Sequence, residues 1–188
     1  METFRSGDLM TIVGRYMTTE DCSKVYRAFL RAADAHDGVF RKGGQPYITH
    51  PLEVARILAD LHMDAEGICA AVLHDVIEDT PYTKDDITIE FGEVVADLVD
   101  GVTKFEYDGF DSKQDALIAS FRKMMGHMTK DYRVVLIKLA DRIHNLRTIG
   151  ATKRASQVRK AKETFELYIP LARRMGMNKV RRELEILA

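Results

Sequence analysis

The sequence predicts an all-α protein, folded as one domain of about ten helices. Helix-forming residues dominate its 188 residues, and only four prolines and twelve glycines interrupt them. Alternation of apolar and polar residues, which would indicate strands, does not persist over a window of six residues. The most strand-like run, "RVVLIKLA" (133–140), continues in helical period through Ile143 and Leu146, so we expect a buried helix there.

Local signals place most of the helix starts. "TTED" resembles a capping box and begins a helix at residue 19, and Asp64 caps another. Pro51 fits the first turn of a helix that follows Thr49, whereas Pro170 lies inside a long helix and is expected to kink it. The expected helices cover residues 8–17, 19–36, 50–62, 65–78, 84–91, 92–101, 112–129, 131–147, 153–175 and 178–187. Long loops are expected over residues 37–47 and 102–112.

Composition excludes several classes of protein. The net charge of −1 argues against a broad DNA- or RNA-binding surface, although a local cluster of cations can still bind a small anion. No apolar run approaches the roughly 20 residues of a membrane span, and residues 1–10 do not resemble a signal peptide. Cys22 and Cys69 have no metal-like spacing and are interpreted as reduced core thiols. We therefore expect a cytoplasmic protein.

Four residues form a candidate metal site: His50, the adjacent pair His74 and Asp75, and Asp141. Taken singly, each has an ordinary structural explanation, as a helix cap, a core histidine or an ion-pair partner. Together they offer two imidazoles and two carboxylates from three expected helices. That mixture suits Mn²⁺ or Fe²⁺ with open positions for water, whereas Zn²⁺ usually prefers more nitrogen or sulfur ligands.

Two further acids follow in "HDVIEDT". Glu78 comes four residues after His74, and Asp79 four residues after Asp75, so we expect each pair to lie on one helix face. A carboxylate one turn from a metal ligand can orient or deprotonate water bound to the metal. Solvated acids at a helix end are the alternative, but the cluster of carboxylates would then repel itself without a cation.

The remaining candidates are polar groups near the proposed ligands. Asn145 follows Asp141 by one turn, where its amide can bind a ribose hydroxyl or a phosphate, and we expect Arg142, His144 and Arg147 to point elsewhere. The loop "RKGGQPYITHP" offers Arg41, whose planar guanidinium can stack on a base or pair with phosphate. A plain surface loop is the alternative.

Six ordered phrases resemble the hydrolase domain of the RelA/SpoT family, within the HD superfamily of metal-dependent phosphohydrolases. They are "RKGGQPYITHPLEVARIL", "AAVLHDVIEDT", "VDGVTKF", "FRKMM", "DYRVVLIKLADRIHNLRT" and "ETFELYIPLARRMGMNKVRRELE". The resemblance covers about residues 20–188. It implies a Mn²⁺-dependent hydrolase, with Fe²⁺, Co²⁺ or Zn²⁺ as less expected ions. The enzyme would remove the 3′-pyrophosphate of ppGpp or pppGpp and release GDP or GTP.

The same resemblance implies roles for individual residues. His50, His74, Asp75 and Asp141 match the metal ligands, and Glu78 and Asp79 match the acids that activate water. The nucleotide-binding positions are matched by Arg41, Lys42, Asn145 and Thr148. Gly43 stands where the family commonly has Ser, which puts one polar contact to the nucleotide in doubt.

Three functions remain open on the sequence alone. They are an alarmone pyrophosphohydrolase, another HD nucleotide phosphatase or phosphodiesterase, and an inactive nucleotide-binding domain. The phrases around Arg41 and Glu78 favour the first, and the intact set of proposed ligands and acids argues against the third. We expect a domain spanning residues 1–188 without a synthetase or regulatory domain, either a stand-alone enzyme or part of a longer one. The oligomeric state and the preference between ppGpp and pppGpp are not predicted.

Overall fold

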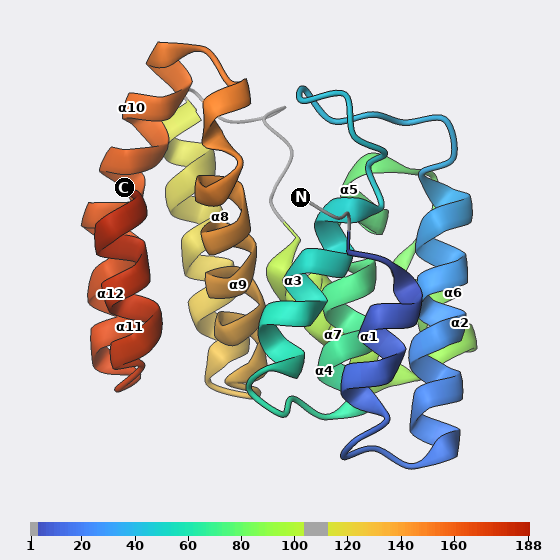
Figure 1. Cartoon of the computed structure of the whole chain (residues 1–188). Helices are drawn as coiled ribbons and strands as arrows, with labels where there is room; N and C mark the ends of the chain where they lie inside the picture. Colours follow the sequence, from blue (N-terminus) through green and yellow to red (C-terminus); the bar gives the residue numbers. More distant parts are fainter. Residues whose placement is uncertain (1–3, 104–112) are drawn as a thin grey trace.

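The predicted all-α fold is confirmed by a computed structural model, which describes residues 4–103 and 113–188 (Figure 1). Each of the ten expected helices has a counterpart among the described residues. The expected loop 102–112 lies outside them beyond Thr103, as does the expected first residue of the following helix.

The first half of the chain forms helices that pack around α4. They are α1 (Ser6–Val13), α2 (Thr19–Ala35), α3 (Thr49–Ala59), α4 (Ala65–Leu73), α5 (Val76–Asp79), α6 (Lys84–Phe91) and α7 (Glu93–Val102). α4 contacts α2, α3 and α7, and its residues are almost all buried. An apolar helix surrounded by others in this way is typical of the centre of a helical domain.

The second half begins with α8 (Lys113–Met128) and the buried helix α9 (Arg133–Arg147). The short turn η1 (Ile149–Ala151) leads to α10 (Arg154–Glu163), η2 (Thr164–Tyr168), α11 (Ile169–Arg174) and α12 (Asn178–Leu187). α9 packs against α3 and α7 on one side and against α8 and α12 on another, and so joins the two halves. The prediction that residues 133–140 form a buried helix rather than a strand is confirmed.

The capping signals read from the sequence are also confirmed. The Thr18 hydroxyl accepts a hydrogen bond from the amide of Asp21, whose carboxylate accepts from the amide of Thr18. The Asp64 carboxylate accepts from the amide of Gly67 at the start of α4. These bonds satisfy backbone donors that a helix start leaves without partners. The first helix is shorter than predicted, because α1 ends at Val13 and Gly14 follows as its cap.

The predicted continuous helix 65–78 is wrong, since the chain leaves regular helix at His74 and Asp75 between α4 and α5. The Nδ1 atom of His74 lies 2.7 Å from the carbonyl oxygen of Ala71. In an unbroken helix that oxygen would accept from the amide of Asp75, so the imidazole competes with the backbone for it. The break therefore falls at the candidate ligand pair.

The predicted helix 153–175 is likewise divided, into α10, η2 and α11. η2 is a π-helical turn in which the amide of Ile169 donates to the carbonyl of Thr164, five residues earlier. Pro170 follows at once and has no amide hydrogen, so it cannot form the usual bond to Glu166 and its ring would crowd that carbonyl. The wider turn accommodates the proline at the place where a kink was expected.

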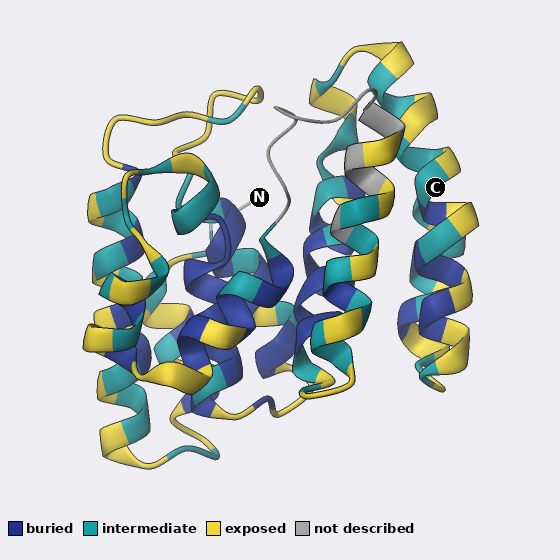
Figure 2. Ribbon diagram, turned by 180° about the vertical axis from the view of Figure 1, so that it is seen from behind, coloured by how far each residue is buried: buried dark blue, intermediate teal, exposed yellow. Residues whose placement is uncertain are grey.

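Buried residues lie along the inner faces of the helices (Figure 2). The apolar core includes Leu58, Leu73, Ile137 and Ile143, from α3, α4 and α9. Burying side chains of this size supplies about 1.5–3 kcal/mol each. Cys69 is buried in this core and Cys22 packs against it, both as free thiols, in agreement with their interpretation as core residues.

A hairpin-like loop between α2 and α3 covers one end of the molecule, the upper end in Figure 1. Its chain doubles back in a tight turn, in which the amide of Gly44 donates to the carbonyl of Arg41 over 2.8 Å. The φ angle of Gly44 is 80°, in the left-handed region that favours glycine. The turn brings Arg41 and Lys42 to the end of the fold where α9 and α10 also meet.

Among the described residues, no helix combines the length and the apolar character that crossing a membrane requires.

Several charged side chains are buried in the fold, namely Asp75, Lys138 and Asp141. Buried charges need partners, and these three lie close together.

We predict that Ile137→Ala lowers the free energy of unfolding by about 2–5 kcal/mol, because it opens a cavity where α9 crosses the core. Ile137 is 0% exposed, whereas Ile186 at the end of α12 is 83% exposed. Chemical denaturation should show that Ile186→Ala changes stability by less than about 0.5 kcal/mol. Equal losses in the two variants would contradict the assignment of α9 as the core helix.

Candidate functional site

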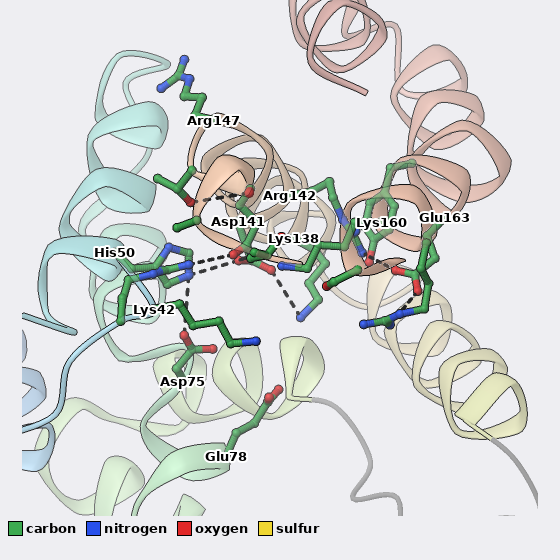
Figure 3. Close-up of a pocket in the computed structure, with 18 of the residues that line it drawn as sticks. Lys42, His50, Asp75, Glu78, Lys138, Asp141, Arg142, Arg147, Lys160 and Glu163 are labelled. Carbon is green, nitrogen blue, oxygen red and sulfur yellow. Dashed lines mark hydrogen bonds and ion pairs between the residues drawn. The ribbon is translucent and has the colours of Figure 1, made fainter. Parts of the chain in front are cut away.

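Three helical segments bring the proposed ligands together. His50 lies in the first turn of α3, His74 and Asp75 lie at the break between α4 and α5, and Asp141 lies in the middle of α9. All four are buried, with between 1% and 8% of their surface exposed. Side chains from segments about 25 and 65 residues apart along the chain therefore meet inside the fold, as Figure 3 shows for His50, Asp75 and Asp141.

The distances within this group are short. The Nε2 atom of His50 lies 3.2 Å from Oδ1 of Asp141 and 3.6 Å from Oδ2 of Asp75. The Nε2 atom of His74 lies 3.2 Å from Oδ1 of Asp75 and 3.9 Å from Oδ1 of Asp141. One ligand atom each from His50, His74 and Asp141 lies within 4.8 Å of the others, and Asp75 contacts both imidazoles.

Hydrogen bonds hold both imidazoles with Nε2 directed at the cluster. Because the carbonyl oxygen of Ala71 can only accept, the Nδ1 atom of His74 must donate to it. The Nδ1 atom of His50 lies 2.6 Å from Nδ1 of His144, so one proton is shared between these two nitrogens. If His50 provides that proton, its Nε2 is left free to bind a cation, which is the usual arrangement of a metal-binding histidine.

The group fits a divalent cation. The Nε2 atom of His74 is buried and has no hydrogen-bond partner among the described residues. The two buried carboxylates of Asp75 and Asp141 face one buried ammonium, that of Lys138, whose Nζ lies 3.8 Å from Oδ2 of Asp141. The carboxylates also raise the pKa of His74. When both imidazoles are neutral, as metal binding requires, one negative charge is left over in a poorly hydrated place, where a cation is strongly stabilising. Nitrogen and oxygen donors together suit Mn²⁺, Fe²⁺ or Zn²⁺.

Electrostatic effects in the cluster favour charged carboxylates. Burial opposes the charged form of Asp141, but the neighbouring His50 and the charge of Lys138 outweigh it and hold its pKa well below the usual value. Burial also opposes the charged form of Asp75, and the neighbouring His74 imidazole lowers its pKa overall. Burial lowers the pKa of His50, which keeps its imidazole neutral. Charged carboxylates and a neutral imidazole are the forms that bind metal.

Glu78 and Asp79, the proposed catalytic acids, belong to α5 and border the same space. Glu78 is half-buried and points toward it from beside Asp75, whereas Asp79 is exposed (Figure 3 shows Glu78). The amide of Asp79 donates to the carbonyl of Asp75, so the turn that follows the break is helical. Both acids therefore lie about one turn from the ligand pair, as the spacing predicted.

A cavity of about 1440 Å³ opens from the cluster. The loop between α2 and α3, the C-terminal part of α9 and the helix α10 form its walls. All four proposed nucleotide-binding residues line it: Arg41, Lys42, Asn145 and Thr148. A space of this size can enclose a nucleotide.

Hydrogen bonds connect the polar wall to the cluster. The Asn145 side-chain nitrogen donates to Asp141, and its oxygen accepts from Arg41 over 3.0 Å. The Arg41 guanidinium lies over the ring of Tyr47, 5.9 Å from its centroid, and its Nη1 atom is buried without a hydrogen-bond partner among the described residues. The Thr148 hydroxyl donates to the carbonyl of His144. Arg41 is therefore held in place with one donor unused.

Three residues that sequence reasoning did not select contact the cluster. His144 was expected to point elsewhere, and this is wrong, since it is buried against His50. The Tyr47 hydroxyl donates to Oδ2 of Asp75 over 2.8 Å, and Lys138 flanks Asp141. His144 and Lys138 are each three residues from Asp141, so the helical period could have revealed them. Tyr47 had no comparable signal.

The arginines of α9 are paired. Arg142 bonds Glu163 and lies 4.1 Å from the centroid of the Tyr168 ring, and Arg147 bonds Glu183. Both nevertheless border the cavity, which corrects the expectation that they point away from it.

A Cβ atom added at Gly43 would lie 3.7 Å from that of Ala151, which is an ordinary contact. The loop therefore has room for the serine that is common in the family.

An all-α domain with buried histidines and aspartates facing a cavity defines a class of candidate metal-dependent enzymes. The HD domain family matches residues 28–178, and the chain belongs to this family. The matched range contains all of the proposed site residues.

Individual proteins that resemble the chain have more specific names than the family. The chain is 55% identical over 157 residues to a guanosine-3′,5′-bis(diphosphate) 3′-pyrophosphohydrolase of Haemophilus influenzae, covering 84% of this chain and 23% of that protein. It is 47% identical over 177 residues to the bifunctional (p)ppGpp synthase/hydrolase SpoT of Escherichia coli, covering 94% and 25%. A GTP pyrophosphokinase of Streptomyces coelicolor is 49% identical over 170 residues, covering 90% and 20%. The chain thus spans about a quarter of the length of these relatives.

A solved structure of similar size also resembles the chain. It is a metazoan ortholog of SpoT, described as hydrolysing ppGpp and playing a role in starvation responses. The TM-score is 0.64 with 25% sequence identity, covering 92% of this chain and 95% of that one. The fold is therefore shared over nearly the full length of both chains.

We predict that His144→Leu lowers the free energy of unfolding by about 1–3 kcal/mol, because it leaves the buried Nδ1 of His50 without a hydrogen-bond partner. His144→Asn should lose less, since its amide oxygen can accept at about the position of Nδ1. Chemical denaturation of the two variants in the absence of metal measures the difference. A larger loss in the Asn variant would show that the contact with His50 has no stabilising role.

Proposed function

We propose that this chain is a metal-dependent hydrolase that removes the 3′-pyrophosphate of guanosine 3′,5′-bis(diphosphate) alarmones. The observation that carries the proposal is the buried group of His50, His74, Asp75 and Asp141 at one side of a nucleotide-sized cavity. The names of the relatives support the choice of substrate, and the ppGpp-hydrolysing ortholog has a chain of similar extent. The products would be GDP or GTP and pyrophosphate.

Mn²⁺ is the ion we expect in the site, held by His50, His74, Asp75 and Asp141. A divalent cation there would act as a Lewis acid that lowers the pKa of a water molecule and polarises a phosphate oxygen. The tautomers of both imidazoles suit this role when His50 donates to His144. Tyr47 holds Asp75 by a hydrogen bond from its hydroxyl, and Asn145 holds Asp141 in the same way. These contacts orient the ligands before a cation arrives.

Glu78 and Asp79 are the proposed acid–base groups. Release of intact pyrophosphate requires that water adds to the phosphorus next to the ribose and that the 3′ oxygen departs with a proton. One carboxylate can accept the proton of the water, and a carboxyl can return a proton to the ribose oxygen. Both acids line the same cavity as Asp75 and Asp141.

The wall formed by Arg41, Lys42, Asn145 and Thr148 would bind the nucleoside. Arg41 is oriented by Asn145 and Tyr47 and borders the cavity, so we expect its guanidinium to contact a base or a phosphate there. Lys42 adds a positive charge on the same loop and borders the same cavity. The amide of Asn145 bonds both Asp141 and Arg41, and we expect the ribose to bind next to it.

The proposal is tested by incubating the purified chain with ppGpp, with and without Mn²⁺, and separating the nucleotides. We expect GDP and intact pyrophosphate to appear only when Mn²⁺ is present. Release of inorganic phosphate from simple mononucleotides would instead support a different HD phosphatase. Bound metal without any turnover of ppGpp would contradict the proposed substrate.

We predict that Glu78→Ala and Asp79→Ala each reduce kcat by about 10²–10⁴-fold, the usual contribution of a general acid or base. Their metal content should stay unchanged, because neither is a proposed ligand. Glu166→Ala is the matched control, since Glu166 is an acid that borders the cavity from η2 but pairs with Lys162. Normal turnover in both α5 variants would remove the proposed role.

A further inference from the structure

Most of the cations that border the cavity form an ion pair among the described residues, although Arg142 and Arg159 share one carboxylate. The paired cations and their carboxylates are Arg142 with Glu163, Arg159 with Glu163, Lys162 with Glu166, Arg147 with Glu183 and Lys138 with Asp141. The cavity-lining cations without an ion pair among the described residues are Arg41, Lys42 and Lys160. Arg41 and Lys42 belong to the proposed nucleotide wall, whereas Lys160 lies across the cavity on α10 and has no role so far.

Lys160 is surrounded by other positive charges. Its side chain is half-buried beside Arg142 (Figure 3). Burial lowers the pKa of Lys160, and the charges of Arg142, Arg41 and Arg159 lower it further, opposed by the carboxylate of Asp141. Lys160, Arg41 and Asp141 line the same cavity, so a ligand in it can contact the ammonium group and the guanidinium together.

Such an arrangement is unfavourable for the isolated protein. A half-buried ammonium loses part of its hydration, and neighbouring cations repel it. The other basic residues of α10 show what a merely structural lysine does there, because Arg159 and Lys162 each pair with an acid four residues later. Position 164, four residues after Lys160, is a threonine whose hydroxyl donates to the backbone carbonyl of Lys160. Among the described residues no helical partner is provided, so a ligand with a negative charge would stabilise this ammonium group.

We propose that Lys160 and Arg41 together form an anion subsite that binds a diphosphate group of the substrate. This inference deepens the function proposed above and rests on it. The subsite makes the cavity selective for nucleotides with two separate anionic groups, one at the metal cluster and one between α10 and the Arg41 loop. A nucleoside with a single phosphate would leave one of the two places empty.

Two diphosphates of the substrate have the required chemistry. Lys160 contacts either the 3′-pyrophosphate that leaves or the 5′-diphosphate that stays on the product. GDP carries only the second, and inorganic pyrophosphate corresponds to the first. These two compounds are therefore the probes that show which diphosphate Lys160 contacts.

The test is the binding of GDP and of inorganic pyrophosphate to the metal-free chain, measured separately by calorimetry. This readout does not depend on turnover, so it stays informative if ppGpp is not the substrate. The variants are Lys160→Gln, which removes the charge at similar size, and Lys160→Arg, which keeps it. Lys162→Gln is the matched control, because Lys162 lies two residues away on the same helix, borders the same cavity and is paired, with 72% of its side chain exposed.

Lys160→Gln should weaken one of the two probes by on the order of 10- to 100-fold, the range of a hydrogen bond between charged groups. Loss of GDP binding assigns Lys160 to the 5′-diphosphate, and loss of pyrophosphate binding assigns it to the leaving group. Lys160→Arg should retain most of the affinity, and Lys162→Gln should bind both probes normally. The inference is overturned if the wild-type chain binds neither probe, if Lys160→Gln binds both normally, or if Lys162→Gln loses as much. A chain that binds the probes through Lys160 but leaves ppGpp intact would contradict the proposed function alone.

Discussion

The burial of two carboxylates beside two imidazoles is the constraint on which the rest of the site depends. Asp75 and Asp141 lie in the interior of an all-α fold, where an unpaired charge is costly. Three helical segments must therefore meet within a few ångströms to supply His50, His74 and Lys138 as partners. The helices α3, α4 and α9 pack together in the core, and at one end of their contact they bring this polar group together.

Irregular features of the backbone occur at the site. In an unbroken helix the adjacent side chains of His74 and Asp75 would point in different directions. The chain leaves regular helix at these two residues, and both side chains approach the same space. The π-helical turn before Pro170 places Tyr168 beneath Arg142 at the far side of the cavity. Interruptions of this kind cost backbone hydrogen bonds, and they are often found where side chains have a functional task.

Charge is distributed unevenly over the cavity. One part of its lining is acidic, with Asp75, Glu78, Asp79 and Asp141, whereas the loop between α2 and α3 carries Arg41 and Lys42 and α10 carries Lys160. A metal ion would neutralise the acidic residues, and a polyanion would neutralise the cationic ones. Binding of the two is then mutually favourable, which is consistent with a metal-dependent enzyme acting on a nucleotide with several phosphates.

Much of the fold followed from local patterns, and the parts that did not depend on contacts distant in the sequence. Thr18 and Asp64 marked helix starts because capping involves residues only three apart. The break after Leu73 could not be read in this way, since it depends on how the His74 imidazole is oriented by the surrounding core. Residue types and the resemblance pointed to the ligand group, whereas Tyr47, 28 residues from Asp75, and Lys160 became visible only in three dimensions.

The central claim is that His50, His74, Asp75 and Asp141 bind one divalent cation. Its most direct test is anomalous diffraction at the manganese absorption edge from crystals of the chain grown with Mn²⁺. We expect one peak among these side chains, about 2.0–2.4 Å from Nε2 of both histidines and from an oxygen of each aspartate. A peak elsewhere, or none at this position with Mn²⁺ in excess, would contradict the account.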